Sequence, residues 1–275
     1  MYVAFLGPRG SFTQQVAQQA FPTAELLSYD TITEVMKAVE QGAVDYSVIP
    51  VENSIEGSVH ETIDYLFHQA DLRAVAEVVQ PIFQQLMVAA NPADIQVIYS
   101  HPQALAQGKK YIDEHYPQAR LEATASTAYA ARFVANHPEQ PFAAIAPQAA
   151  AEEYNLTIVA QDIQEMSQNF TRFWVLGNES VSLPLAQTAR KCSLALTLPD
   201  NLPGALYKAM SVFAWRGIDL TKIESRPLKT ALGEYFFILD VVNTDPELLD
   251  YALKELTSLG ISYKILGDYV IYQAQ

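Results

Sequence analysis

The segment NFTRFWVLG, residues 169–177, predicts a short β-strand that begins with polar residues. Residues 173–176 are aromatic or otherwise typical of strands, and a glycine ends the run. In an extended chain Thr171 and Phe173 share one face, while Arg172 points to the other. A hydroxyl then stands beside an aromatic ring at the mouth of a strand. Two interpretations stay open here: a ligand-binding or catalytic hydroxyl, and an ordinary strand-end threonine followed by a solvated arginine.

Length and composition indicate a globular protein with about two domains. The chain has 275 residues, half of them hydrophobic and 17% charged, which is enough apolar material for real cores. It has no apolar run of membrane-spanning length and no signal peptide, so we expect no membrane partner. Its single cysteine, Cys192, excludes an intrachain disulfide and fits a cytoplasmic location. The net charge of -14 argues against binding to nucleic acid.

The N-terminus predicts a strand, a glycine-rich turn and a helix. Residues 2–6 are apolar, Gly7-Pro8-Arg9-Gly10 breaks the strand, and Ser11 is a good N-cap for a helix over Phe12–Ala20. Backbone N–H groups and a helix dipole converge at such a turn and favour an anion. The spacing is not that of a P-loop, and a plain turn is the alternative. If the acidic N-terminal region binds an anion, Arg9 and Arg172 are the cations in unusual local sequence.

Strands alternate with helices along the next hundred residues, which predicts an α/β fold with a mostly parallel sheet. The strand at 44–49 ends in Pro50–Val59, and open α/β sheets bind ligands beyond the carboxyl ends of their strands. Asn53 and Ser54 are hydrogen-bonding groups at this place. Ser58 is expected to cap a helix that runs to Phe67.

A second strand end with polar groups follows further along. The extended segment 72–89 is expected to cross from one lobe to another. The strand at 95–99 ends at Ser100, and a helix is expected over residues 104–115, with Gln107 in its first turns. Ser126 is expected to cap an alanine-rich helix.

The pattern changes after a polar linker at 179–190. From residue 191 the expected order is strand, helix, strand, strand, helix, strand within about 85 residues, which is a ferredoxin-like βαββαβ module. The expected bounds of these six elements are 192–198, 203–216, 220–226, 234–242, 246–259 and 262–272, with a turn at Thr230–Gly233.

The C-terminal module resembles an ACT domain, a small regulatory unit that binds amino acids. The motifs are Leu202-Pro203-Gly204-Ala205-Leu206 and Ile223-Glu224-Ser225-Arg226-Pro227, as in the phenylalanine-binding ACT domains of prephenate dehydratases. The N-terminal region is similar to the same family in residues 7–12, 50–59, 100–107, 126–127 with 130–131, 149–150 and 169–173. We expect no chorismate mutase segment before Met1, so the resemblance is to the monofunctional family.

The resemblance implies a two-lobed, periplasmic-binding-protein-like catalytic domain over residues 1–178, a linker over 179–190 and an ACT domain over 191–275. It implies conversion of prephenate to phenylpyruvate, water and CO₂, with phenylalanine lowering the activity. Aromatisation drives this reaction, so no cofactor is expected. Two alternatives stay open: an arogenate dehydratase with the same motifs, and a non-catalytic amino-acid sensor.

The resemblance also implies roles for individual residues. Thr171 is the expected catalytic donor to the departing hydroxyl. The five histidines show no metal spacing, so no metal site is expected. The expected assembly is a homodimer or homotetramer. The expected substrate-binding residues are Asn53, Ser100, Gln107, Arg172, Phe173, Arg9, Gly10 and Ser11. The expected phenylalanine-binding residues are Asn201, Leu202, Pro203, Gly204, Ala205, Leu206, Glu224, Ser225, Arg226 and Pro227.

Overall fold

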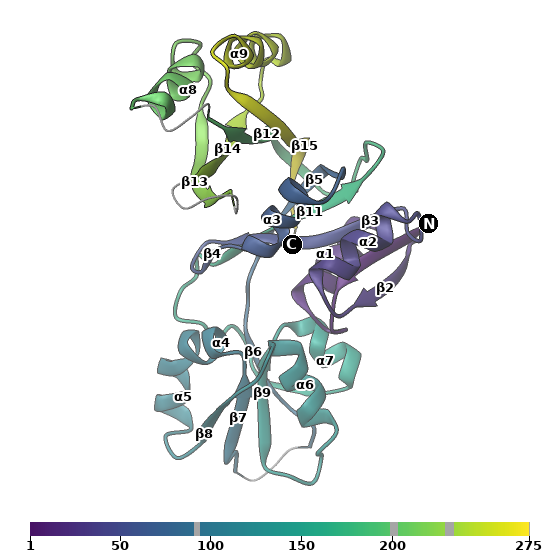
Figure 1. Cartoon of the computed structure of the whole chain (residues 1–275). Helices are drawn as coiled ribbons and strands as arrows, with labels where there is room; N and C mark the ends of the chain where they lie inside the picture. The colour runs from purple at the N-terminus through teal and green to yellow at the C-terminus, as the bar shows by residue number, and fades with distance from the viewer. Residues whose placement is uncertain (91–93, 199–202, 229–233, 275) are drawn as a thin grey trace.

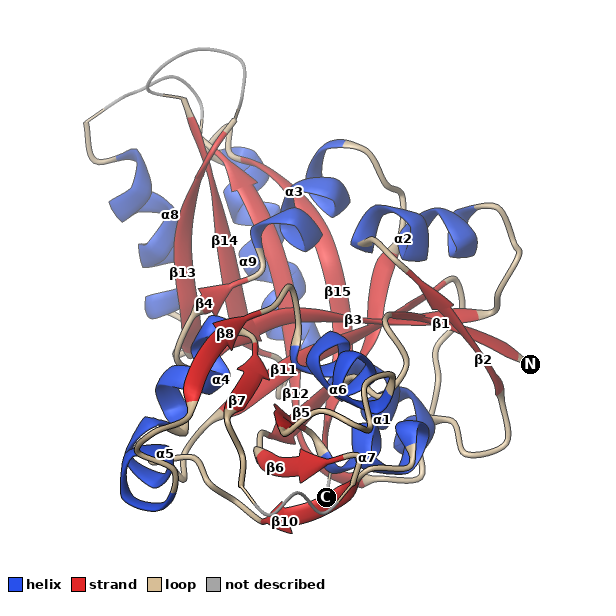
Figure 2. Ribbon diagram, turned by 90° about the horizontal axis from the view of Figure 1, so that it is seen from below, coloured by secondary structure: helices blue, strands red, loops and turns tan. Residues whose placement is uncertain are grey.

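The computed structural model describes residues 1–90, 94–198, 203–228 and 234–274. The chain forms three bodies, which we call the first lobe, the second lobe and the C-terminal module (Figure 1). The first lobe lies between the other two, and the second lobe is nearest the viewer in Figure 2. Among the described residues, no helix is both long and apolar enough to cross a membrane.

The first lobe is a sheet with helices on both faces. Its elements are β1 (Tyr2–Leu6), α1 (Phe12–Ala20), β2 (Glu25–Tyr29), α2 (Ile32–Glu40), β3 (Tyr46–Asn53), β4 (Gly57–Ser58), α3 (His60–His68), β5 (Arg73–Pro81) and β11 (Phe170–Gly177). The strand order is β5-β11-β3-β1-β2, with β1 parallel to both neighbours and β11 antiparallel to β3 and β5. The apolar stripe of α1 packs on one face, and α2 and α3 pack on the other.

The second lobe is a smaller sheet in the order β10-β6-β9-β7-β8. Its elements are β6 (Gln85–Val88), β7 (Val97–Ser100), α4 (Pro102–Gln107), α5 (Lys109–His115), β8 (Arg120–Ala123), α6 (Thr127–Ala135), β9 (Phe142–Ala146), α7 (Gln148–Tyr154) and β10 (Thr157–Ala160). The helix expected over residues 104–115 is wrong as one element, because it divides at Gly108 into α4 and α5. A Cβ at Gly108 would lie 3.1 Å from Ile163 Cδ1, so a glycine suits this close passage.

The chain crosses between the lobes twice. The expected crossing within residues 72–89 is confirmed, because β5 belongs to the first sheet and β6 to the second. The chain returns after β10, and β11 enters the first sheet between β3 and β5. The opening segment NFTRFWVLG thus contains a central strand of the first lobe, over residues 170–177.

The C-terminal module is ferredoxin-like. Its elements are β12 (Ala186–Thr197), α8 (Ala205–Ala214), β13 (Leu220–Pro227), β14 (Tyr235–Val242), α9 (Pro246–Ser258) and β15 (Ser262–Gln273). The strands pair in the antiparallel order β13-β14-β12-β15, and α8 and α9 share a hydrophobic cluster with them. The expected turn at Thr230–Gly233 and the motif residues Asn201 and Leu202 lie outside the described residues.

The sheet of the C-terminal module continues into the first lobe. Strand β15 pairs in parallel with β5, so one ten-stranded sheet runs through both bodies. At Gly267 the two strands approach so closely that a Cβ would lie 2.6 Å from the carbonyl oxygen of Ala74. Residues 186–190, expected in a linker, belong to β12 because they pair with the end of β15. The boundary between the domains is therefore a shared sheet, and the connecting segment is shorter than expected.

Candidate active site

A cavity of about 390 Å³ lies between the two lobes. The first lobe contributes the turn after β1, the end of β3 and the start of β11. The second lobe contributes the starts of α4 and α6. The crossing segment between β5 and β6 closes one side with Ile82 and Gln84. The polar strand ends that the sequence indicated therefore meet in one place.

Thr171 lies in this cavity and is paired with Asn53 across the sheet. The Asn53 Nδ2 group donates a hydrogen bond to Thr171 Oγ1 at 2.9 Å. The Asn53 Oδ1 atom accepts from the backbone N–H groups of Ile55 and Glu56 at 3.0 and 3.1 Å, which fixes the orientation of the amide. Because the Thr171 oxygen is an acceptor from Asn53, its own proton is available to donate to a ligand.

A chain of amide groups supports this pair from behind. Asn53 Nδ2 also donates to Asn169 Oδ1 at 2.9 Å, and Asn169 Nδ2 donates to Gln107 Oε1 at 3.2 Å. Asn169 and Gln107 are 2% and 8% exposed. Gln107 was expected to bind substrate directly, but it is absent from the cavity lining and holds Asn169, which the predicted substrate-binding residues omitted. It belongs to α4 of the second lobe, so the network joins both lobes.

Two helix N-termini open into the cavity from opposite lobes. Ser11 caps α1 by accepting from the Gln14 N–H at 3.2 Å, and Ser126 caps α6 by accepting from the Tyr129 N–H at 3.1 Å, as expected. Both serines line the cavity. Backbone N–H groups and positive dipole ends on two sides suit a small ligand with two carboxylates.

Three other predicted substrate contacts lie elsewhere. The Ser100 hydroxyl is fully buried and donates to the Ile145 carbonyl at 2.6 Å. The Arg9 side chain is exposed and lies 3.7 Å from Glu153, outside the cavity lining. The Gly10 N–H donates to Gln14 Oε1 at 2.5 Å. Each group already has a partner within the protein, so the geometry does not support these three as ligand contacts.

Arg172 also points away from the cavity, onto the opposite face of the sheet from Thr171. Its guanidinium contacts Glu52, Glu77 and Asp240 at 2.5, 2.6 and 2.7 Å. Burial opposes its charge, but Asp240 and Glu77 outweigh burial and raise its pKa above the ordinary value. Because three carboxylates surround it, the expected role of Arg172 in substrate binding is not supported. Phe173 lines the cavity beside Thr171.

Sequence reasoning omitted several cavity residues. His101, which lies in the segment 100–107 that resembles the family, lines the cavity and caps α4, with its Nδ1 accepting from the Gln103 N–H at 3.4 Å. Gln84 lines the cavity and is 4% exposed, and its Oε1 has no hydrogen-bond partner among the described residues. In the ranges that the structure describes, no group of three or more His, Cys, Asp or Glu side chains is placed to hold a metal ion.

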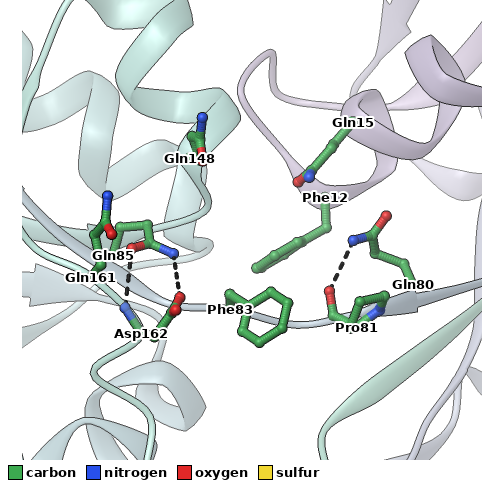
Figure 3. Close-up of a pocket in the computed structure, with 9 residues that line it drawn as sticks. All are labelled: Phe12, Gln15, Gln80, Pro81, Phe83, Gln85, Gln148, Gln161 and Asp162. Carbon is green, nitrogen blue, oxygen red and sulfur yellow. Dashed lines mark hydrogen bonds between the residues drawn. The ribbon is translucent and has the colours of Figure 1, made fainter. Parts of the chain in front are cut away.

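A second cavity, of about 270 Å³, lies on the other side of the crossing segment. Residues 81, 83 and 85 line it, whereas residues 82 and 84 line the first cavity, as expected for an extended chain. Figure 3 shows Phe12 of the first lobe close to Phe83, and the Gln85 amide bonded to Asp162 of the second lobe. The crossing segment therefore separates two spaces between the lobes.

The regulatory motif of the C-terminal module is divided between two surfaces. Gly204 is the N-cap of α8 and has a positive φ of 80°. Glu224 and Arg226 face the first lobe, where Glu224 accepts from Ser58 at 2.5 Å and Arg226 binds Asp64 at 3.0 Å. Ser225 and Pro227 alternate with them and are exposed. The expected phenylalanine contacts remain a prediction.

The bond to Glu224 overturns another expectation, since Ser58 does not cap α3; the N-cap is Val59. Burial opposes ionisation of the Glu224 carboxyl. The hydrogen bond from Ser58 and the charge of Lys222 outweigh burial and hold the pKa of Glu224 below its ordinary value.

Comparison with known proteins agrees with this architecture. Residues 3–181 match the family model described as prephenate dehydratase. A prephenate dehydratase of Lactococcus lactis subsp. lactis is 54% identical and covers 99% of this chain and 98% of its own length. The X-ray structure of prephenate dehydratase from Streptococcus mutans is 46% identical, with a TM-score of 0.66 and 99% of each chain covered. A prephenate dehydratase structure in complex with L-Phe from Arthrobacter aurescens is 31% identical, with a TM-score of 0.85 and 98% and 90% of the chains covered. The chain belongs to the prephenate dehydratase family.

Proposed function

We propose that this chain converts prephenate to phenylpyruvate, water and CO₂, with Thr171 as the donor to the departing hydroxyl. The observation that carries the assignment is the Asn53–Thr171 hydrogen bond, in which the Thr171 oxygen accepts and its proton stays available to donate to a ligand in the cavity. The family match supports the reaction class.

The reaction breaks two bonds of a cyclohexadiene. The bond from the ring to its carboxylate breaks and releases CO₂, and its electron pair enters the ring. The hydroxyl on the opposite carbon leaves with its bonding pair and takes up a proton from solvent to become water. The aromatic product supplies the driving force. The protein must therefore hold the dianion and stabilise charge on the departing oxygen. A threonine is a weak acid, so its contribution is a positioned hydrogen bond.

The two helix N-termini fit the two carboxylates of prephenate. The α1 N-terminus at Ser11 and the α6 N-terminus at Ser126 belong to different lobes and line the same cavity. The Phe173 side chain would contact the substrate ring beside Thr171. A ligand held by both N-termini would also hold the two lobes together around the reacting atoms.

The regulatory proposal is that L-phenylalanine binds the C-terminal module and lowers the activity. The relative from Arthrobacter aurescens was crystallised with L-Phe, which supports this effector. The binding residues would be those of the two motifs at 202–206 and 223–227. Gly204→Asp should abolish phenylalanine sensitivity, because a carboxylate at this helix start would repel the amino acid's carboxylate. A homo-oligomer and a cytoplasmic location stay predictions.

The test is phenylpyruvate formation from prephenate, measured by absorbance in alkali, with and without phenylalanine. Thr171→Ala should lower kcat by about 10²–10³-fold with an unchanged melting temperature, and Thr171→Ser should retain most turnover. Full turnover by Thr171→Ala would remove the catalytic assignment. Turnover of arogenate in preference to prephenate would move the substrate assignment to arogenate.

A further inference from the structure

Two neighbouring cross-strand pairs face opposite sides of the first-lobe sheet. Thr171 pairs with Asn53 on the side of the cavity. The next pair, Arg172 with Glu52, faces the C-terminal module. Each member of the second pair is bonded through the backbone to a member of the first. A shift of the Arg172–Glu52 pair must therefore move the Thr171–Asn53 pair.

The C-terminal module holds both members of this second pair. Asp240 on β14 lies 2.7 Å from the Arg172 guanidinium. Lys222 on β13 lies 3.1 Å from a Glu52 oxygen. Two strands of the module thus contact the two residues that adjoin the proposed catalytic pair.

The Arg172 contacts are buried and geometrically fixed. Glu77 and Asp240 are each 1% exposed, and Glu77 binds the guanidinium through both carboxylate oxygens at 3.0 and 2.6 Å. The Ser193 hydroxyl donates to the other oxygen of Asp240 at 2.5 Å, and it lies 2.7 Å from the Tyr269 hydroxyl. A buried charge that loses its partner is costly, so β14 and Arg172 must move together.

We propose that Asp240 and Lys222 of the C-terminal module are positioning residues for the dehydratase reaction. They hold the Arg172–Glu52 pair and thereby set the position of Thr171 and Asn53 on the opposite face. The same contacts carry the effector's influence from the module to the cavity, a part that rests on the proposed function. A misplacement of about 1 Å at a reacting group lowers turnover by about 10²-fold, so small shifts of β14 suffice.

The charge balance makes Asp240→Asn a usable variant. Arg172 contacts Glu52, Glu77 and Asp240, and Lys222 contacts Glu52 and Glu224, so the cluster holds four carboxylates and two cations. Replacing Asp240 by asparagine leaves the two cations with three carboxylates, so neither cation loses all of its partners. Arg172 keeps its contacts with Glu77 and Glu52, and we expect the fold to persist.

The experiment measures kcat and KM for prephenate in the full chain. Asp240→Asn and Lys222→Met should each lower kcat by about tenfold and leave KM within about twofold. Asp64→Asn is the matched control, since Asp64 binds Arg226 across the same domain boundary but does not adjoin Asn53 or Thr171. It should retain wild-type kcat. An equal loss in Asp64→Asn would show general loosening of the boundary and overturn the proposal.

The effector arm uses Asp240→Asn with L-phenylalanine. Calorimetry should give a Kd within about twofold of wild type, while inhibition of turnover weakens by about fivefold or more. Wild-type kcat together with wild-type inhibition would overturn the proposal. Lost inhibition through lost phenylalanine binding would also overturn the coupling role, because it would place Asp240 in the effector site.

A readout independent of activity separates this proposal from the proposed function. Hydrogen exchange of the peptides covering 46–53 and 169–177 should increase in Asp240→Asn and stay unchanged in Asp64→Asn. If the wild-type protein fails to convert prephenate, the proposed function fails. The exchange result then still decides whether the module holds these strands, and unchanged exchange in Asp240→Asn would overturn that.

Discussion

Gln107 of the second lobe accepts a hydrogen bond from Asn169 Nδ2 of the returning chain at 3.2 Å. Through Asn169 and Asn53 this contact reaches the Thr171 hydroxyl in the first lobe. The side chains that line the cavity and the side chains that join the two lobes thus belong to one network of amide groups. This arrangement makes turnover sensitive to residues that never contact the ligand.

Gln107→Leu should lower kcat by about tenfold with a smaller change in KM, because the buried Asn169 amide loses its acceptor. Steady-state kinetics with prephenate measures this change. Gln118→Leu, at an exposed position of the same lobe, is the control and should leave kcat unaltered. A Gln107→Leu enzyme with normal kcat would show that the network does not position Thr171.

Asn53→Asp tests the direction of the Thr171 hydrogen bond. The aspartate can still accept from the Ile55 and Glu56 N–H groups, but it cannot donate to Thr171 Oγ1. It would instead accept the Thr171 proton and repel a dianionic substrate, so kcat/KM should fall by about 10³-fold. Asn53→Ala removes the donor without adding charge and should be less damaging. A milder defect in Asn53→Asp than in Asn53→Ala would contradict the assigned donor.

Gly267→Ala tests the junction between the first lobe and the C-terminal module. The new Cβ would lie 2.6 Å from the Ala74 carbonyl oxygen and 2.7 Å from the Ala74 Cβ. We expect a loss of about 1–3 kcal/mol in the free energy of unfolding, because backbone must move. Gly108→Ala is the comparison, since its nearest neighbour is the flexible end of Ile163 at 3.1 Å. Chemical denaturation measures both, and equal losses would disprove the close approach.

The buried thiol of Cys192 should lower the free energy of unfolding at alkaline pH. Burial, and then the charges of Asp268 and Asp240, raise the pKa of its thiol from 9.0 to about 12. The unfolded chain releases the proton above about pH 9, whereas the folded chain retains it until about pH 12, so stability falls across this range.

Cys192→Ala should unfold with a shallower pH dependence between pH 9 and 11 in thermal melts, and it should keep the part that comes from buried Tyr269, whose pKa is also raised. The native thiol should resist a disulfide reagent at pH 8 and react after denaturation. Rapid reaction of the folded protein would refute the burial argument.

Local signals in the sequence were sufficient for several elements. The glycine-proline break ended the strand β1 at the expected place, and Ser11 gave the bounds of α1. These features depend on neighbours within a few residues. Strand β10 was not predicted, because it has only four residues and lies partly exposed at the edge of the sheet.

Side-chain partners across the sheet were beyond sequence reasoning. The acids that bind Arg172 stand at positions 52, 77 and 240, and no spacing along the chain relates them. Ser100 is of a residue type that often contacts ligands, but its hydroxyl donates a hydrogen bond to the Ile145 carbonyl on the neighbouring strand β9. The motif at 169–173 therefore located the cavity correctly, whereas the individual roles required the fold.

The shared sheet limits how the regulatory part can be exchanged between enzymes. A C-terminal module cut from the chain near residue 186 would leave the β5-facing edge of β15 with unpaired backbone groups, which invites self-association. A module grafted from another protein would need a glycine where β15 meets Ala74 and a carboxylate where β14 meets Arg172. The C-terminal module is therefore built to fit this catalytic domain, and a module from another protein would need changes in each strand that contacts the first lobe.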